Sequence, residues 1–293
     1  MKQRSITSVV YVVVWLALCA MKWLVPDGWG SLGFDAVFCA ISILGSLELL
    51  RALKGISYPQ KIVTIAFCAV VVPLYVATQM TVNAGFIAVA CCFCLYALVL
   101  AALNVFNHGT STVKGTATCL FTMLYCGVLS VILSAVNHVA HNSTAAIITL
   151  FLIIMLTDSL AFIFGITFGK LAPLKLAPKL SPHKTVIGGV GGILGGMIGA
   201  VAAYFIYYGL GKVIGTPLVY DGSVHPAVVF MLMGLVTSVI AQIGDLFESA
   251  IKRECGIKDM GKLLPGHGGV LDRFDSMLFS AVVVLLGFTV IIA

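Results

Sequence analysis

Two pairs of acidic residues near the C-terminal end of the chain could bind a cation. Asp245 and Glu248 form the first pair, and Asp272 and Asp275 form the second, with a spacing of three in each. Basic residues accompany them, namely Lys252, Arg253, Lys258, Lys262 and Arg273. Carboxylates bind hard cations such as Mg²⁺, and Lys and Arg bind phosphate oxygens. The segment therefore predicts phosphate chemistry.

The rest of the chain has the composition of a membrane protein. Of the 293 residues, 60% are hydrophobic and 10% are charged, and the mean hydropathy is +1.12. Water-soluble proteins carry about 25% charged residues. Long apolar runs favour membrane-spanning helices over a barrel. We therefore predict an all-α, polytopic membrane protein.

The apolar runs predict about nine transmembrane helices. They lie near residues 7–25, 31–50, 61–79, 84–106, 117–135, 145–168, 186–210, 226–251 and 270–292. The second contains Asp35 and Glu48, and the glycine-rich seventh could also form a re-entrant segment. The first is expected to be retained as a span and not cleaved as a signal peptide.

The distribution of basic residues predicts the orientation of these helices. With nine spans, only Lys22 and Lys212 fall on the side opposite the other basic residues. The positive-inside rule then places the N-terminus in the cytoplasm and the C-terminus outside. We expect residues 1–140 to form an N-terminal transmembrane scaffold of about five spans. Residues 141–293 would form a C-terminal catalytic region with a cytoplasm-facing site.

The two acidic pairs are expected to meet near the cytoplasmic ends of the last two spans. Ionised carboxylates inside a membrane are costly unless they are paired, hydrated or bound to metal, and four together repel one another. Lys252, Arg253 and Arg273 could compensate them as a salt-bridge network. One or two Mg²⁺ ions, with a monovalent cation as a further option, explain the carboxylates and the basic residues together.

Three further features are candidate binding sites. His267 lies among Gly266, Gly268 and Gly269, where backbone amides could bind an anion, although a simple hairpin is the alternative. The lysine-rich loop 170–185 could be a binding site, or it could only be a basic cytoplasmic loop that contacts anionic lipid headgroups. Asp158 is an intramembrane acid, for which a functional role is the default hypothesis.

The C-terminal segment resembles the signature of the phosphatidate cytidylyltransferase family, also called CDP-diacylglycerol synthases. The matching residues are Ser249, Lys252, Arg253, Lys258, Asp259, Gly261, Leu264, Pro265, His267, Gly268, Gly269, Asp272, Arg273 and Asp275. Two upstream segments are also similar: Ser181, Pro182, Lys184 and Thr185, and Asp158, Ala161, Phe164, Gly165 and Gly169. The chain departs from the family pattern at His183, Val186 and Ile187.

The resemblance implies transfer of a cytidylyl group from CTP to phosphatidic acid, with release of pyrophosphate. It also implies a Mg²⁺-dependent site facing the cytoplasm, with Asp245 and Asp272 as principal ligands and Asp275 and Glu248 nearby.

From this implied reaction we assign an expected role to each basic or polar residue. The expected charge-neutralising residues are Lys252, Arg253, Lys258 and Arg273. The expected substrate-binding residues are Asp158, Ser181, Lys184, Ser249, Lys262, His267, Gly268 and Gly269.

Two other functions remain open from the sequence. A CTP-dependent lipid-alcohol kinase would use a similar pocket, and an ion-coupled transporter could also carry intramembrane acids. The expected partners are CTP, phosphatidic acid and membrane lipids, without nucleic acid, and a homodimer is one expected assembly. A bacterial inner membrane is the expected location.

Overall fold

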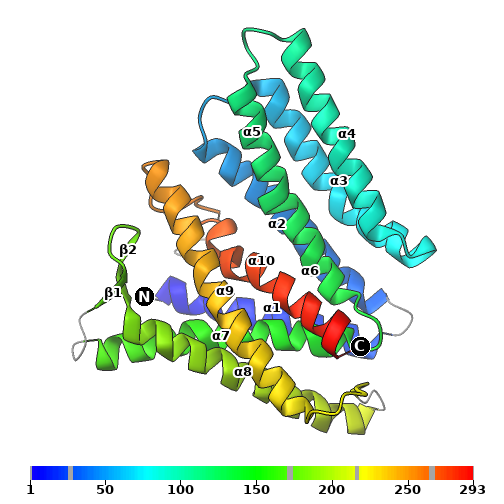
Figure 1. Cartoon of the computed structure of the whole chain (residues 1–293), viewed down its shortest axis with the longest axis vertical. Helices are drawn as coiled ribbons and strands as arrows, with labels where there is room; N and C mark the ends of the chain where they lie inside the picture. Colours follow the sequence, from blue (N-terminus) through cyan, green and yellow to red (C-terminus); the bar gives the residue numbers. More distant parts are fainter. Residues whose placement is uncertain (1, 26–28, 170–173, 215–217, 264–267, 293) are drawn as a thin grey trace. The chain divides into compact units, whose positions relative to one another are not determined.

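The chain folds into helices joined mostly by short connections (Figure 1). The computed structural model describes residues 2–25, 29–169, 174–214, 218–263 and 268–292. The α-helices are α1 (Lys2–Leu24), α2 (Leu32–Ala52), α3 (Tyr58–Val82), α4 (Gly85–Phe106), α5 (Val113–Thr122), α6 (Leu129–Asn137), α7 (Ser143–Phe168), α8 (Val186–Ile214), α9 (Pro226–Glu254) and α10 (Leu271–Leu286). Short 3₁₀ or π turns lie at Trp29–Ser31, Met123–Val128 and Gly287–Ile291.

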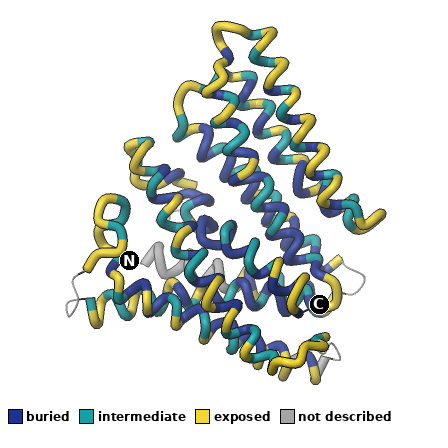
Figure 2. Tube along the Cα trace, in the orientation of Figure 1, coloured by how far each residue is buried: buried dark blue, intermediate teal, exposed yellow. Residues whose placement is uncertain are grey.

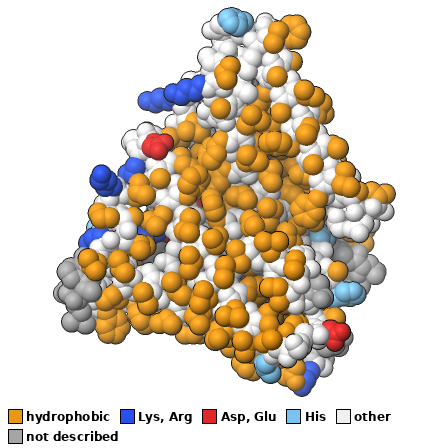
Figure 3. All heavy atoms as spheres, viewed as in Figure 1, with side chains coloured by type: hydrophobic (Ala, Val, Ile, Leu, Met, Phe, Trp, Pro, Cys, Tyr) orange, Lys and Arg blue, Asp and Glu red, His pale blue; other side chains and the backbone are white. Residues whose placement is uncertain are grey.

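The predicted all-α membrane fold is confirmed. Among the described residues, eight helical segments are long and apolar enough to cross a membrane. The predicted fifth span is the segment Val113–Asn137, in which a π turn joins α5 to α6. The predicted first span corresponds to α1, in which the described stretch Val13–Leu24 is apolar. Hydrophobic side chains are spread over the whole face in Figure 3, whereas charged side chains lie toward its edges, as contact with lipid requires.

The chain divides into two compact units. Unit 1 comprises Met1–Ser134 and Cys255–Phe274, and unit 2 comprises Ala135–Glu254 and Asp275–Ala293. The division places the segment between α9 and α10 with the N-terminal helices. The expectation that residues 141–293 form the catalytic region remains a prediction.

In unit 1, about half of the residues of α2 are buried, whereas much of α4 is exposed (Figure 2). The side chains of Phe34, Phe38 and Leu49 on α2 are fully buried. α2 also buries two acids, Asp35 and Glu48, which are 6% and 5% exposed. The Ser134 hydroxyl donates a hydrogen bond to Asp35.

In unit 2, the glycine-rich segment forms one continuous helix, α8, between α7 and α9. A Cβ atom at Gly195 would lie 2.2 Å from the backbone oxygen of Leu156 on α7. A Cβ at Gly196 would lie 2.4 Å from Cβ of Ser238 on α9. The glycines therefore let the backbones of neighbouring helices approach closely, as small residues do in membranes. The alternative of a re-entrant segment is wrong.

The lysine-rich loop before α8 contains a small antiparallel hairpin that the sequence did not predict. Its strands are β1 (Lys175–Ala177) and β2 (Ser181–Thr185), paired with Lys175 opposite Thr185. Thr185 accepts a hydrogen bond from the Gly188 amide at 3.1 Å, which satisfies one donor at the start of α8. The hairpin thus continues directly into α8.

We predict that Gly195→Ala destabilises the protein by about 1–3 kcal/mol, because the added methyl group overlaps the α7 backbone. The midpoint of unfolding in detergent measures this change. Gly209→Ala is the matched control, because no heavy atom lies within 4 Å of a Cβ at that position of α8. Equal stability of the two variants would contradict the close packing of α7 and α8.

Candidate functional site

The C-terminal part of α9 carries acidic and basic side chains on one face. Glu248 and Lys252 are four residues apart and form an ion pair. Glu248 is fully buried, and the Lys252 side chain is 12% exposed. Lys184, from β2, forms an ion pair with Asp245, and these two side chains are about one third exposed. Lysines therefore compensate both acids of the first predicted pair.

Asp275 of α10 joins these acids within unit 2. A Cβ at Gly244 on α9 would lie 3.0 Å from the Asp275 backbone oxygen, so the two helices are in close contact. The Asp275 carboxyl lies close enough to Glu248, Asp245 and Lys252 to interact with all three. Carboxyl groups so close together repel one another when ionised, and a proton or a cation between them would relieve this repulsion. We call Asp245, Glu248 and Asp275 the carboxylate cluster.

Arg253 connects the end of α9 to the hairpin. Its Nε donates to the backbone oxygen of Leu180 at 3.2 Å, at the turn between β1 and β2. Ser181 follows this turn and is half-buried. Together with the Lys184–Asp245 pair, this contact holds the hairpin against the polar end of α9. Lys184, a predicted substrate-binding residue, is thereby placed at the carboxylate cluster, and Ser181 lies in the same hairpin.

In unit 1, Asp272 organises the segment that leads into α10. Its Oδ2 accepts hydrogen bonds from the amides of Met260, at 2.8 Å, and Gly269, at 2.7 Å. The second bond resembles a capping box, in which a side chain of the first helical turn accepts from an amide three residues before it. Gly268 has φ +86°, a backbone conformation that favours glycine. The anion at the Gly269 amide is therefore a carboxylate of the chain itself.

Glu48 of α2 also binds this segment. Its two carboxylate oxygens accept hydrogen bonds from the amides of Val270 and Leu271, each at 3.0 Å. No role in the site was predicted for Glu48. The available signal was a buried acid in a membrane span, which is a functional candidate by default.

The remaining predicted residues divide between the two units. Lys258, Lys262 and Arg273 are exposed in unit 1. In unit 2, Ser249 is buried on α9 and Asp158 is exposed on α7. His267 lies outside the described residues. Because Asp245 and Asp272 belong to different units, their expected convergence remains a prediction.

The donor set of the carboxylate cluster suits Mg²⁺ in kind, because it offers oxygen ligands alone. In the described part of the chain, however, no three His, Cys, Asp or Glu side chains form a group that could hold a metal ion. The nearest cations to Asp245 and Glu248 are instead the lysine ammonium groups. The salt-bridge alternative thus accounts for these two acids as they stand.

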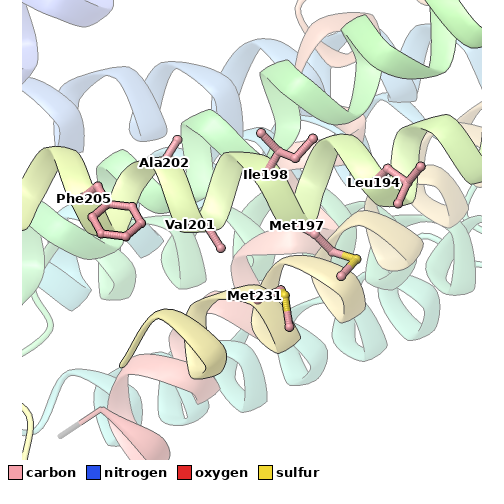
Figure 4. Close-up of a pocket in the computed structure, with 7 residues that line it drawn as sticks. All are labelled: Leu194, Met197, Ile198, Val201, Ala202, Phe205 and Met231. Atoms are coloured by element: carbon pink, nitrogen blue, oxygen red, sulfur yellow. The ribbon is translucent and has the colours of Figure 1, made fainter. Parts of the chain in front are cut away.

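Unit 2 also carries an apolar groove between α8 and α9 (Figure 4). Residues that line it include Leu194, Met197, Ile198, Val201, Phe205 and Met231. Because hydrophobic side chains alone line it, this groove cannot be the site of phosphate chemistry. It suits an acyl chain.

Comparisons with known proteins agree over nearly the whole chain. The sequence model of a family described as the cytidylyltransferase family matches residues 2–291. A phosphatidate cytidylyltransferase of Staphylococcus haemolyticus is 30% identical over 280 residues, which is 95% of each chain. Phosphatidate cytidylyltransferases of Staphylococcus aureus and Staphylococcus epidermidis are also 30% identical, over 282 and 284 residues and 95% of each chain.

The two ion pairs should differ in their contribution to stability. Lys252→Met removes the ammonium group that pairs with fully buried Glu248, and we expect a loss of roughly 3 kcal/mol in the free energy of unfolding. Lys184→Met breaks a pair that is about one third exposed, and we expect a loss below about 1 kcal/mol. Unfolding by denaturant in mixed micelles measures both values. A smaller effect for Lys252→Met than for Lys184→Met would contradict the assigned burial.

Proposed function

The chain belongs to the cytidylyltransferase family, and from this premise we propose that it transfers the cytidylyl group of CTP to phosphatidic acid. A phosphate oxygen of phosphatidic acid would attack the α-phosphorus of CTP and form a new phosphorus–oxygen bond. The bond between the α-phosphorus and the bridging oxygen to the β-phosphate would break. The products are CDP-diacylglycerol, which stays in the membrane, and pyrophosphate.

The observation that carries this proposal is the carboxylate cluster with its lysines at one end of membrane-spanning α9. Both substrates are anions, so cations must offset their repulsion before in-line attack can occur. Lys184 and Lys252 form ion pairs with Asp245 and Glu248 of the cluster, and Arg253 is exposed one residue after Lys252. No strong base is needed, because the attacking phosphate is already ionised at neutral pH.

The basic residues of the signature are proposed to bind the phosphates of CTP. Arg253 and Arg273 offer forked donors, whereas Lys252 and Lys258 offer mobile point charges. All four lie in or next to the segment that separates α9 from α10. Ser181, Lys184, Ser249 and Lys262, together with Asp158, His267, Gly268 and Gly269, are proposed to form the rest of the substrate site.

We further propose that the reaction requires Mg²⁺, in one or two ions, with a monovalent cation as a further option. Asp245 and Asp272 would be the principal ligands, with Asp275 and Glu248 nearby. When bound, the ion would supply positive charge to phosphate oxygens. The support for this proposal is the oxygen-only donor set of the carboxylate cluster, in which three carboxyl groups accompany two lysines.

The lipid substrate is proposed to lie along unit 2. The apolar groove between α8 and α9 could take one acyl chain, because it shares α9 with the carboxylate cluster. We propose an active site that faces the cytoplasm in a bacterial inner membrane, with the N-terminus inside and the C-terminus outside. A homodimer is one assembly to test.

The two alternative functions have no support from the comparisons. The relatives of this chain are named for cytidylyl transfer, and none of those reported above is named as a lipid kinase or a transporter. The family match also extends through all the membrane spans. Cytidylyl transfer is therefore the function that the chain supports best.

The position of a radioactive label separates cytidylyl transfer from phosphoryl transfer. With purified protein, phosphatidic acid and CTP labelled at the α-phosphate, we expect the label in the lipid product. With CTP labelled at the γ-phosphate, we expect the label in pyrophosphate. When a lipid alcohol replaces phosphatidic acid, transfer of the γ-phosphate label to the lipid would identify a kinase, and absence of any transfer to either lipid in detergent would contradict enzymatic activity.

Metal dependence should be reversible in the wild-type protein. EDTA is expected to abolish turnover, and added Mg²⁺ is expected to restore it. In Asp245→Asn we expect turnover to remain at least ~100-fold low at any Mg²⁺ concentration, because a principal ligand is lost. Asp221→Asn, at an exposed aspartate before α9, is the matched control. Turnover that is indifferent to EDTA would favour the salt-bridge alternative.

A further inference from the structure

Glu48 is a buried acid of unit 1 that the proposed reaction does not use. It lies near the C-terminal end of α2 and is 5% exposed. Its carboxylate accepts the amides of Val270 and Leu271, which are 222 and 223 residues away in sequence. These amides lie at the start of α10, where a helix leaves its first donors without intrahelical partners and carries partial positive charge. The contact therefore satisfies two donors and one buried negative charge at once.

Two glycines of the segment between α9 and α10 lie very close to the Glu48 carboxylate. A Cβ at Gly261 would lie 2.2 Å from Oε1 of Glu48. A Cβ at Gly269 would lie 2.5 Å from Oε2 of Glu48. Any side chain at either position would displace the carboxylate or the backbone. The backbone of the segment thus passes Glu48 at three places, at residues 261, 269 and 270–271.

Asp272 holds the same segment from within. Its Oδ2 joins the amides of Met260 and Gly269, which are nine residues apart in the chain. Glu48 and Asp272 together fix both ends of the part that begins at Met260 and ends at α10. Exposed Lys258 and Lys262 lie on or beside this part, and Arg273 follows it.

We propose that Glu48 is a positioning residue that fixes the described parts of this segment, residues 255–263 and 268–272, in the conformation that binds substrate. The proposal rests on the proposed function, because Lys258 of this segment is assigned to the CTP phosphates and Lys262 to the rest of the substrate site. It adds a residue of the N-terminal helices to the catalytic arrangement. It also implies that the Val270 and Leu271 amides hold the protein together and do not bind substrate.

The test compares Glu48→Gln with Asp35→Asn. Both positions are buried acids of α2, and they are about 20 Å apart along the helix, so that Asp35 is remote from the segment. The first measurement is the rate of trypsin cleavage after Lys258 and Lys262 in detergent. Cleavage after Lys179, which is exposed in the hairpin of unit 2, provides the internal reference. The second measurement is kcat and the KM for CTP.

We expect Glu48→Gln to raise cleavage after Lys258 and Lys262 at least ~10-fold relative to Lys179, because hydrogen bonds to a charged group are lost. We expect kcat to fall ~10-fold to 100-fold, because misplaced binding groups slow the reaction. Asp35→Asn should leave the cleavage ratio unchanged. Glu48→Asp, which keeps the charge, should recover part of both values.

Gly261→Ala should also displace the segment from Glu48, because the added methyl group would overlap the Glu48 carboxylate. We expect it to raise the cleavage ratio and lower kcat as Glu48→Gln does. The double variant should be no worse than the more affected single variant, because both changes remove one shared arrangement. If Glu48→Gln does not fold, Gly261→Ala and Glu48→Asp provide the test.

An unchanged cleavage ratio in Glu48→Gln would overturn the proposal. A raised ratio with unchanged kcat would also overturn it, since the segment would then be held for stability alone. Failure of the proposed function is a separate result. Wild-type protein that forms no CDP-diacylglycerol would refute the function, while the cleavage ratio would still report whether Glu48 holds the segment.

Discussion

Every buried acid in this chain must be compensated, because an ionised carboxylate inside a membrane protein is costly when it is alone. The two units meet this requirement in different ways. In unit 1, backbone amides compensate Glu48 and Asp272, and the Ser134 hydroxyl donates a hydrogen bond to Asp35. In unit 2, lysines compensate Asp245 and Glu248. A hydrogen bond from a backbone amide to a carboxylate fixes the course of the backbone. An ion pair with lysine instead places a carboxylate and a cationic group side by side, where an anionic substrate could bind.

This division of roles suits a reaction between two anions at a membrane. The helices of unit 2 supply both a polar end, at the carboxylate cluster, and an apolar groove along α8 and α9. A lipid with a phosphate headgroup needs a polar surface for its headgroup and an apolar surface for its acyl chains, no farther apart than the length of the lipid. The part of the signature that belongs to unit 1 carries exposed lysines and an arginine on a backbone that Glu48 and Asp272 restrain.

The sequence predicted the parts of the fold that depend on local composition. Lipid imposes one requirement, a long apolar helix, and so the spans could be located from hydropathy alone. Whether the glycine-rich segment was a helix depended on packing against α7 and α9, which sequence spacing does not reveal. The residue types of the site followed from the signature. The partners did not, because Glu48 reaches Val270 across 222 residues and Lys184 reaches Asp245 from an unpredicted hairpin.

The most direct test of this account is the hydrogen exchange of the Val270 and Leu271 amides in the purified protein. Amides in the first turn of a helix lack intrahelical acceptors and ordinarily exchange fast. Because Glu48 accepts both hydrogens, we predict slow exchange in the wild-type protein and fast exchange in Glu48→Gln. Fast exchange of both amides in the wild-type protein would contradict the central claim that buried carboxylates fix the backbone of the signature segment.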